Sequence, residues 1–217
     1  HYPLRRQRQM CIRDSNTRGV LTSYDIDTKV IESINSIQSK QIRAFDVDIR
    51  FDKNLFWLVA ADGSISKYDI GKNELVNIQY IPQSNFVASK ATSIKSNGKW
   101  LLLGSESQGI LLIEQISGKS FVFNENNNLS NNFIADIQVD ENNNYWFSTN
   151  KGISTLSTYT KKIRTFKSPF DLKNNEYLNG SSLITKSGIA YFGGLKGFRY
   201  FNTSDLQSIG HEFNAPV

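Results

Sequence analysis

Few residues of this 217-residue chain have the types and spacing that catalysis or metal binding requires. Asp140, Asn142 and Asn144 resemble the start of a calcium-binding loop, in which alternate side chains supply oxygen ligands. However, Lys151 stands where such a loop needs a bidentate carboxylate, and the loop glycine is missing. The pattern therefore favours a solvated turn, and we predict no metal site.

Two carboxylate pairs and two histidines are the remaining candidates for acid–base chemistry. The pairs have strand spacing, which places both side chains on one face of a strand or in a turn. The histidines lie near the two ends of the chain, so a Ser-His-Asp arrangement or a histidine-rich metal site is not expected. We predict no catalytic residue and no cofactor. These candidates are Asp25 with Asp27, Asp46 with Asp48, His1, and His211.

The elements that carry these residues are short strands. Between residues 133 and 167 the apolar side chains alternate along four runs that are rich in β-branched and aromatic residues. Polar turns separate the runs, which is typical of an antiparallel sheet. The runs are Ile134–Val139, Tyr145–Thr149, Ile153–Leu156 and Ile163–Phe166.

The same arrangement recurs along the chain. A turn glycine between two apolar runs returns about every 45 residues, which is the size of a four-stranded propeller blade. Helical repeats would instead show a 3.6-residue period. The sequence therefore predicts an all-β fold, a partial β-propeller of four to five blades that is a fragment of a larger, seven-bladed ring. The glycines are Gly19, Gly63, Gly109, Gly152 and Gly197.

The repeats divide the chain into expected units. A partial blade is followed by three blades, a last blade and a linker toward a further domain. The expected boundaries are 16–38, 39–81, 82–125, 126–170, 171–204 and 205–217.

Residues 1–15 do not fit the repeats. They have no hydrophobic periodicity and no apolar segment of a signal peptide, and they resemble translated sequencing-adapter read-through. We expect them to be foreign to the protein, which makes Cys11, the only cysteine, uninformative. They also carry a net charge of +3 out of the chain's +5, so no basic stripe follows the blades and nucleic-acid binding is not expected.

Residues 126–202 resemble the two-component regulator propeller repeat. That repeat begins with a Leu-Ser-x-Asn-like segment and continues through an aspartate turn, a Trp-Phe strand and a glycine turn. Its last blade has an Asn-Gly segment before a Tyr-Phe-Gly-Gly strand. The matching residues are Leu129, Ser130, Asn132, Asp140, Trp146, Phe147, Ser148, Thr149, Gly152, Ile153, Asn179, Gly180, Tyr191, Phe192, Gly193, Gly194, Gly197 and Phe198.

The resemblance implies a periplasmic sensor. Propellers of this kind form the extracytoplasmic part of hybrid two-component regulators, where they precede a β-sandwich, a membrane helix and a histidine kinase. Many of them respond to an oligosaccharide, and the full-length form is expected to be a dimer. The segment itself carries no kinase motif and is expected to be non-catalytic. A propeller lyase or hydrolase, and an interaction scaffold, remain as alternatives.

Asn131, Asn132 and Asn179 are the predicted ligand-binding residues. They lie where the chain enters an innermost strand, at the concave end of a propeller, and their amides suit hydroxyl groups. The alternative is that they close turns through their own backbone. Trp57, Trp100 and Trp146 could stack on sugars, although their apolar neighbours favour packing between blades.

Overall fold

The computed structural model describes residues 9–10, 22–25, 28–33, 42–47, 55–69, 72, 74–77, 86–166 and 176–205. Within them the chain forms five antiparallel sheets, each built from strands that follow one another in sequence. This confirms the predicted all-β class and the order of the strands. The strands are β1 (Gln9–Met10), β2 (Thr22–Asp25), β3 (Ile31–Ser33), β4 (Ile42–Val47), β5 (Leu55–Ala60), β6 (Ile65–Asp69), β7 (Glu74–Asn77), β8 (Ala91–Ser96), β9 (Trp100–Ser105), β10 (Ile110–Glu114), β11 (Ser120–Phe123), β12 (Ile134–Val139), β13 (Tyr145–Thr149), β14 (Gly152–Leu156), β15 (Ile163–Phe166), β16 (Tyr177–Ile184), β17 (Ile189–Gly194) and β18 (Gly197–Asn202).

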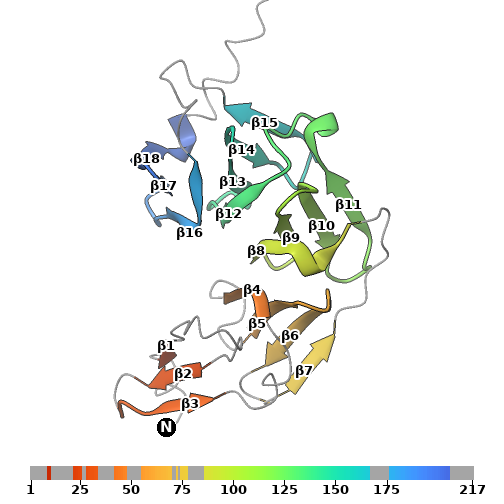
Figure 1. Cartoon of the computed structure of the whole chain (residues 1–217), viewed down its shortest axis with the longest axis vertical. Helices are drawn as coiled ribbons and strands as arrows, with labels where there is room; N and C mark the ends of the chain where they lie inside the picture. The colour runs from red at the N-terminus through yellow and green to blue at the C-terminus, as the bar shows by residue number, and fades with distance from the viewer. Residues whose placement is uncertain are drawn as a thin grey trace, which may run out of the picture.

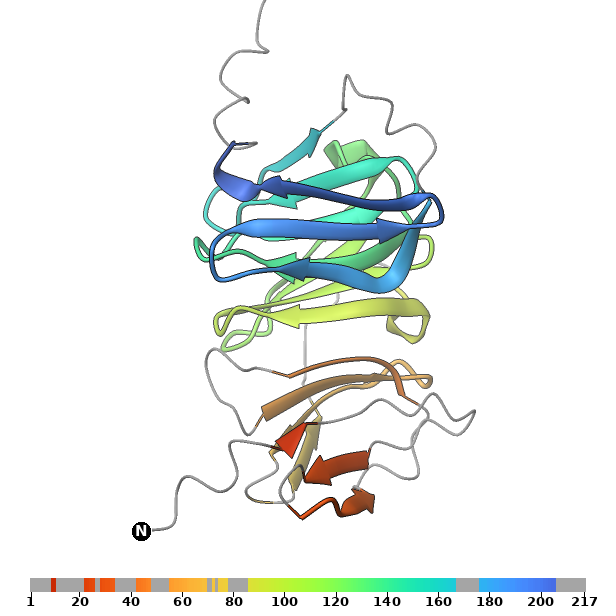
Figure 2. The same ribbon diagram turned by 90° about the vertical axis from the view of Figure 1, so that its left-hand side faces the viewer.

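The sheets fan out around a common centre (Figure 1). Their first strands β4, β8, β12 and β16 are innermost, and consecutive first strands contact each other. Viewed from the side, the sheets lie one upon another (Figure 2). This radial arrangement is that of a partial propeller, as predicted.

Residues 1–15 contribute to the first sheet. Gln9 and Met10 form β1 and pair with Asp25 and Tyr24 of β2. The segment that we expected to be foreign to the protein thus supplies two paired residues, and the rest of it lies outside the described residues, as does Gly19.

Each tight-turn glycine that the structure describes has a positive φ. The values are 83° at Gly63, 80° at Gly109, 135° at Gly152 and 117° at Gly197, a region that L side chains avoid. At Gly109 a Cβ atom would also stand 2.1 Å from the carbonyl oxygen of Phe123. The glycine period seen in the sequence therefore reflects a backbone requirement of the turn between the second and third strands.

The core consists of apolar clusters between consecutive sheets. The residue three positions before the last residue of each second strand shows how consecutive sheets pack. This residue faces the following sheet. Trp57 packs there with Leu101 and Leu103 of the next sheet, and Trp146 packs with Phe192 in the same way. A middle sheet such as β8–β11 therefore buries one face against the preceding sheet and the other face against the following sheet.

All three tryptophans lie in these clusters. Trp57, Trp100 and Trp146 are buried, each in a different one. The favoured interpretation, packing between blades, is confirmed.

The last sheet exposes the face that its predecessors bury. Tyr191 occupies the position of Trp57 and Trp146, and it stacks on Tyr200, a residue that is 68% exposed. Phe198 beside them is 65% exposed. Among the described residues this sheet also has three strands, whereas the preceding three sheets have four.

We predict that this apolar face makes the chain self-associate, because exposed apolar area of this kind drives association. Sedimentation velocity of the wild-type chain should show a sedimentation coefficient that rises with concentration in the micromolar range. The double variant Phe198→Ser/Tyr200→Ser should sediment as a monomer. Tyr159→Ser, which alters an exposed tyrosine elsewhere, should behave as wild type, and a monomeric wild-type chain would contradict the prediction.

Candidate ligand site at the leading edge

The leading edge is the edge of the sheets at which the innermost strands begin. In an antiparallel sheet it also carries the turns between the second and third strands, here residues 106–109, 150–151 and 195–196. The opposite, trailing edge carries the turns between the first and second and between the third and fourth strands. All three predicted ligand residues lie at the leading edge, on two innermost strands or the segments before them.

The segment before β12 is folded by its own side chains. A single turn of 3-10 helix, Glu125–Asn127, is closed by a capping box between Asn124 and Asn127. Asn128 then adopts φ 66°, a conformation that asparagine tolerates. These asparagines explain why the polar stretch of five residues, 124–128, forms an ordered loop.

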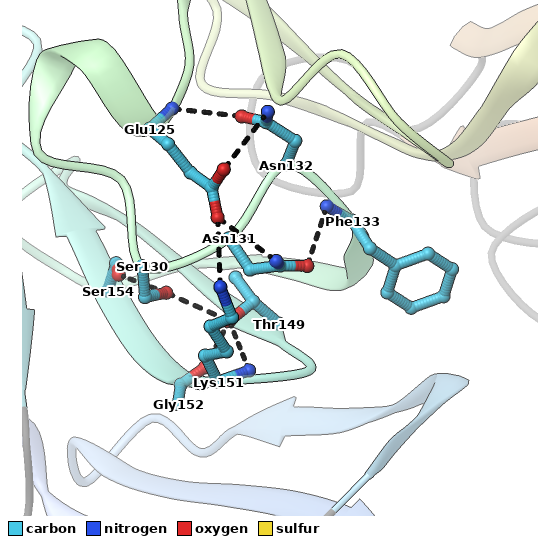
Figure 3. Close-up of polar contacts among 9 residues, drawn as sticks. All are labelled: Glu125, Ser130, Asn131, Asn132, Phe133, Thr149, Lys151, Gly152 and Ser154. Carbon is cyan, nitrogen blue, oxygen red and sulfur yellow. Dashed lines mark hydrogen bonds and ion pairs between the residues drawn. The ribbon is translucent and has the colours of Figure 1, made fainter.

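The Glu125 carboxylate accepts hydrogen bonds from both predicted residues of this loop (Figure 3). Asn131 donates from Nδ2 to Glu125 Oε1 at 3.2 Å, and Asn132 donates from Nδ2 to Oε2 at 3.4 Å. Lys151 Nζ lies 3.3 Å from Glu125 Oε1, and the Glu125 amide donates to Asn132 Oδ1 at 2.9 Å. The structure thus brings Asn131 and Asn132 together around one carboxylate, with a lysine from the neighbouring turn.

Asn131 also closes a turn. Its Oδ1 accepts a hydrogen bond from the amide of Phe133 at 3.0 Å, which is the local arrangement that the alternative interpretation predicts. The amides of Asn131 and Asn132 are therefore both engaged within the loop. A ligand hydroxyl would have to compete with Glu125 for them.

Ser130 and Leu129 hold the same loop against the sheets, Ser130 by hydrogen bonds and Leu129 by apolar packing. The Ser130 hydroxyl lies 2.8 Å from Thr149 Oγ1 and 3.0 Å from Ser154 Oγ, and Leu129 is buried between two sheets. Ser154 Oγ also lies 3.0 Å from Thr165 Oγ1, and the Thr165 hydroxyl donates to the Asn128 carbonyl at 2.8 Å. The Leu-Ser part of the repeat therefore connects the loop to the three strands β13, β14 and β15.

Asn179 lies apart from this cluster, on a bulge of β16. Tyr177 pairs with Gly194 and Ser182 pairs with Phe192, so residues 178–181 stand opposite Gly193 alone. The bulge turns at Gly180, with φ 66°, and Asn179 is exposed. The side-chain amide of Asn179 makes no hydrogen bond to the described part of the chain, so it is free to take a ligand.

The innermost strands all carry a bulge near their start. Register shifts occur between Ile42 and Ala44, between Ala91 and Ser93, and between Ile134 and Asp136. Bulges bend a strand and redirect its side chains, and they are frequent beside binding sites. The much longer bulge of β16 is the largest departure from the repeat at this edge.

Asp136 ties three innermost strands together beneath the leading edge. It is only 6% exposed, and its Oδ2 accepts from the amide of Ser182 at 2.9 Å and from the Ser182 hydroxyl at 2.6 Å. Its Oδ1 accepts from Ser93 Oγ at 3.2 Å and from the amide of Ile137 at 2.8 Å. The carboxylate therefore fixes β16, and with it the bulge of Asn179, to β8 and β12.

Tyr177, at the start of β16, adds a buried hydroxyl. The hydroxyl oxygen has no hydrogen-bond partner among the residues that the structure describes. Burial raises the pKa of Tyr177, and the positive charge of Arg199 opposes that rise. The hydroxyl thus stays protonated at neutral pH.

In the calcium-like turn, the Asp140 carboxylate accepts hydrogen bonds from the protein itself. Asp140 is buried, and its Oδ1 accepts from the amides of Asn142 and Asn144, each at 2.9 Å. Its Oδ2 accepts from Trp146 Nε1 at 2.9 Å. The turn itself is exposed, as predicted, but the Asp140 side chain anchors it to the core rather than facing solvent.

Groups for other chemistry do not gather in the described ranges. No cluster of three or more His, Cys, Asp or Glu residues occurs there, and His1, His211, Cys11, Asp27 and Asp48 lie outside them. No helix in the same ranges is long and apolar enough to cross a membrane.

Sequence reasoning missed Glu125, Lys151 and Asp136. Asp136 did leave a signal, since it is the one charged residue of the strand Ile134–Val139. Glu125 left none, because an acidic residue in a polar loop is ordinary.

No protein-family model matches the chain, and no curated protein matches it. Solved structures do resemble it in fold. One is the extracellular domain assigned to the hybrid two component system BT4673 from B. thetaiotaomicron, at 17% identity and TM-score 0.60, covering 90% of this chain and 26% of that one. Another is that of BT3049 from the same organism, at 14% identity and TM-score 0.64, covering 92% and 26%.

A streptogramin B lyase structure is also similar, at 14% identity and TM-score 0.59, covering 89% of this chain and 65% of that one. The chain thus spans about a quarter of the two sensor domains. At these identities the likeness shows a propeller fold that sensor domains and a lyase share.

Proposed function

We propose that the chain is a ligand-sensing part of the extracytoplasmic propeller of a hybrid two-component sensor, and that it recognises an oligosaccharide. The observation that carries the proposal is the free amide of Asn179, exposed on a bulge of an innermost strand. The engaged amides of Asn131 and Asn132 lie at the same edge. Amides suit the hydroxyl groups of sugars, which both donate and accept hydrogen bonds.

The partners follow from this role. The exposed face of the last sheet supports packing against remaining blades of a longer protein, and a β-sandwich of the same protein would relay the signal to a histidine kinase. The proposal includes a periplasmic location and a dimeric full-length form. It is supported by the fold shared with the extracellular domains of BT4673 and BT3049.

The second candidate is a propeller lyase, favoured by the likeness to the streptogramin B lyase. A lyase needs a general base, and often a metal, close to the substrate. The leading edge offers amides, Glu125 and Lys151, with Glu125 held by three hydrogen-bonding partners. This composition suits binding better than proton abstraction.

The test is titration calorimetry of the chain with a panel of plant and host oligosaccharides. For an oligosaccharide that binds, we predict that Asn179→Ala lowers the affinity about tenfold, because it removes a directed hydrogen bond. The control is Asn150→Ala, an exposed asparagine at the same edge but farther from the innermost strands. Equal losses for the two variants, or no binding by any member of the panel, would refute the proposal.

A further inference from the structure

The trailing edge carries the two most exposed large apolar side chains of the described residues. Ile116 is 94% exposed in the turn between β10 and β11, and Tyr159 is 96% exposed in the turn between β14 and β15. A single exposed apolar side chain is ordinary. Here, however, two of them stand at the tips of neighbouring turns on the same edge of the fold.

Lysine side chains join the two turns into one surface. Lys161 Nζ lies 4.0 Å from the centre of the Phe121 ring, and Lys119 Nζ lies 5.4 Å from the same ring. Lys99 Nζ lies 5.6 Å from the Trp100 ring, which Lys161 also contacts at 5.4 Å. We call this surface the trailing-edge patch; it consists of Lys99, Ile116, Lys119, Tyr159, Lys161 and Lys162.

The positive charge of the patch is only partly compensated. Glu114 lies 3.5 Å from Lys99 and accepts from the Ser117 hydroxyl at 2.6 Å. The hydrogen bond from Ser117 lowers the pKa of Glu114, and so do the charges of Lys99 and Lys161. The carboxylate is therefore ionised, and it is already engaged by Ser117 and Lys99. Lys119, Lys161 and Lys162 form no ion pair with any described residue.

The backbone holds Lys161 over the ring. Lys161 has φ 54° and donates its amide to the Ser157 carbonyl at 2.8 Å. The corresponding residue of the preceding sheet is Gly118, with φ 69° and the same turn hydrogen bond to Glu114. Lysine thus occupies a conformation that favours glycine.

The pattern also recurs in the sequence. An apolar residue and a lysine stand two or three positions apart in the corresponding turns of the first two sheets, as Ile26 with Lys29 and Ile70 with Lys72. Ile26 and Ile70 lie outside the described residues. Lys29 and Lys72 are exposed.

We propose that the trailing-edge patch docks on a membrane surface rich in anionic lipid. Ile116 and Tyr159 stand on separate convex tips, and a bilayer interface accepts both tips at any spacing, whereas a rigid protein partner would need two matched pockets. Tyrosine favours the membrane–water interface, and lysines keep their ammonium groups at the headgroups while their stems lie over apolar surface. An anionic lipid surface also attracts each lysine.

The inference goes beyond the proposed function, since the patch lies at the edge opposite to Asn179. Membrane docking and oligosaccharide binding can therefore fail independently.

The experiment is co-sedimentation of the chain with vesicles of equimolar phosphatidylcholine and phosphatidylglycerol, against vesicles of phosphatidylcholine alone. The wild-type chain should sediment with the anionic vesicles only. The variant Lys119→Gln/Lys161→Asn/Lys162→Gln should bind about fivefold more weakly for each lysine removed; asparagine is chosen at 161 because it tolerates a positive φ. The variant Ile116→Ser/Tyr159→Ser should bind the anionic vesicles about tenfold more weakly than wild type.

Two control variants test whether the patch is the contact. Lys196→Gln alters an exposed lysine at the leading edge, and Leu195→Ser alters an exposed apolar residue of the same turn; both should bind as wild type. The inference is overturned if wild type does not sediment with the anionic vesicles, if it binds neutral vesicles equally, if the patch variants bind as wild type, or if either control loses as much binding as they do. Circular dichroism melting checks that every variant is folded.

Discussion

Trp146→Ala should lower the free energy of unfolding by about 4 kcal/mol, the usual cost of removing a large buried aromatic side chain. Trp146 is fully buried and stacks on Phe166 at 5.5 Å between ring centres, and it packs on Phe201 of the last sheet at 5.4 Å. Its Nε1 also donates to the buried carboxylate of Asp140. The substitution therefore opens a cavity between two sheets and leaves Asp140 with one donor fewer.

Urea unfolding, followed by circular dichroism, measures this loss. Trp146→Phe separates the two contributions, because it keeps an aromatic ring but lacks the N–H group; we expect a loss of about 1 to 2 kcal/mol. Tyr159→Ala is the matched control at an exposed aromatic residue and should stay within about 0.5 kcal/mol of wild type. A Trp146→Ala variant as stable as that control would show that the tryptophan does not hold the two sheets together.

The strands could be predicted from the sequence because their signal is local. The alternation of apolar residues and the positive-φ glycines mark each strand end within about the length of a turn. Tyr145–Thr149 and Tyr177–Asn202 are therefore found where the pattern predicts them. The burial of the tryptophans follows from their apolar neighbours, since the second strands that hold them are buried at every position.

The bulges could not be predicted in this way. A bulge is a mismatch between two strands, so it exists only relative to the partner strand. The extended bulge at residues 178–181 changes which side chains of β16 face outward, and no pattern within β16 announces it. This is why Asn179, Asn131 and Asn132 were grouped by position in the repeat, although the structure joins only the last two.

The contacts of Asp136 show what the repeat period itself encodes. Ser93 precedes Asp136 by 43 residues, and Ser182 follows it by 46. Both separations are one repeat, because in a propeller residues one repeat apart are neighbours on adjacent innermost strands. Polar residues that interrupt apolar strands one repeat apart are therefore candidates for contact across blades. The two sides of the candidate site, Asn132 and Asn179, depend on this connection.

Asp136→Ala tests that connection and should cost about 3 kcal/mol of unfolding free energy, since it leaves four donors on three strands without their charged acceptor. Asp136→Asn should cost less, because its remaining oxygen can still accept from Ser93 and Ile137, while its amide group faces the two donors of Ser182.

Urea unfolding of these two variants is compared with Glu141→Ala, an exposed carboxylate in the next turn that should change stability by no more than about 0.5 kcal/mol. Hydrogen exchange of the Ser182 amide gives a local readout, since loss of its acceptor should speed exchange there while the outer strand β15 stays protected. If Asp136→Ala matches Glu141→Ala in stability and leaves the Ser182 amide protected, the carboxylate does not bind the innermost strands to one another. The position of the Asn179 bulge must then be set by apolar packing between the sheets alone.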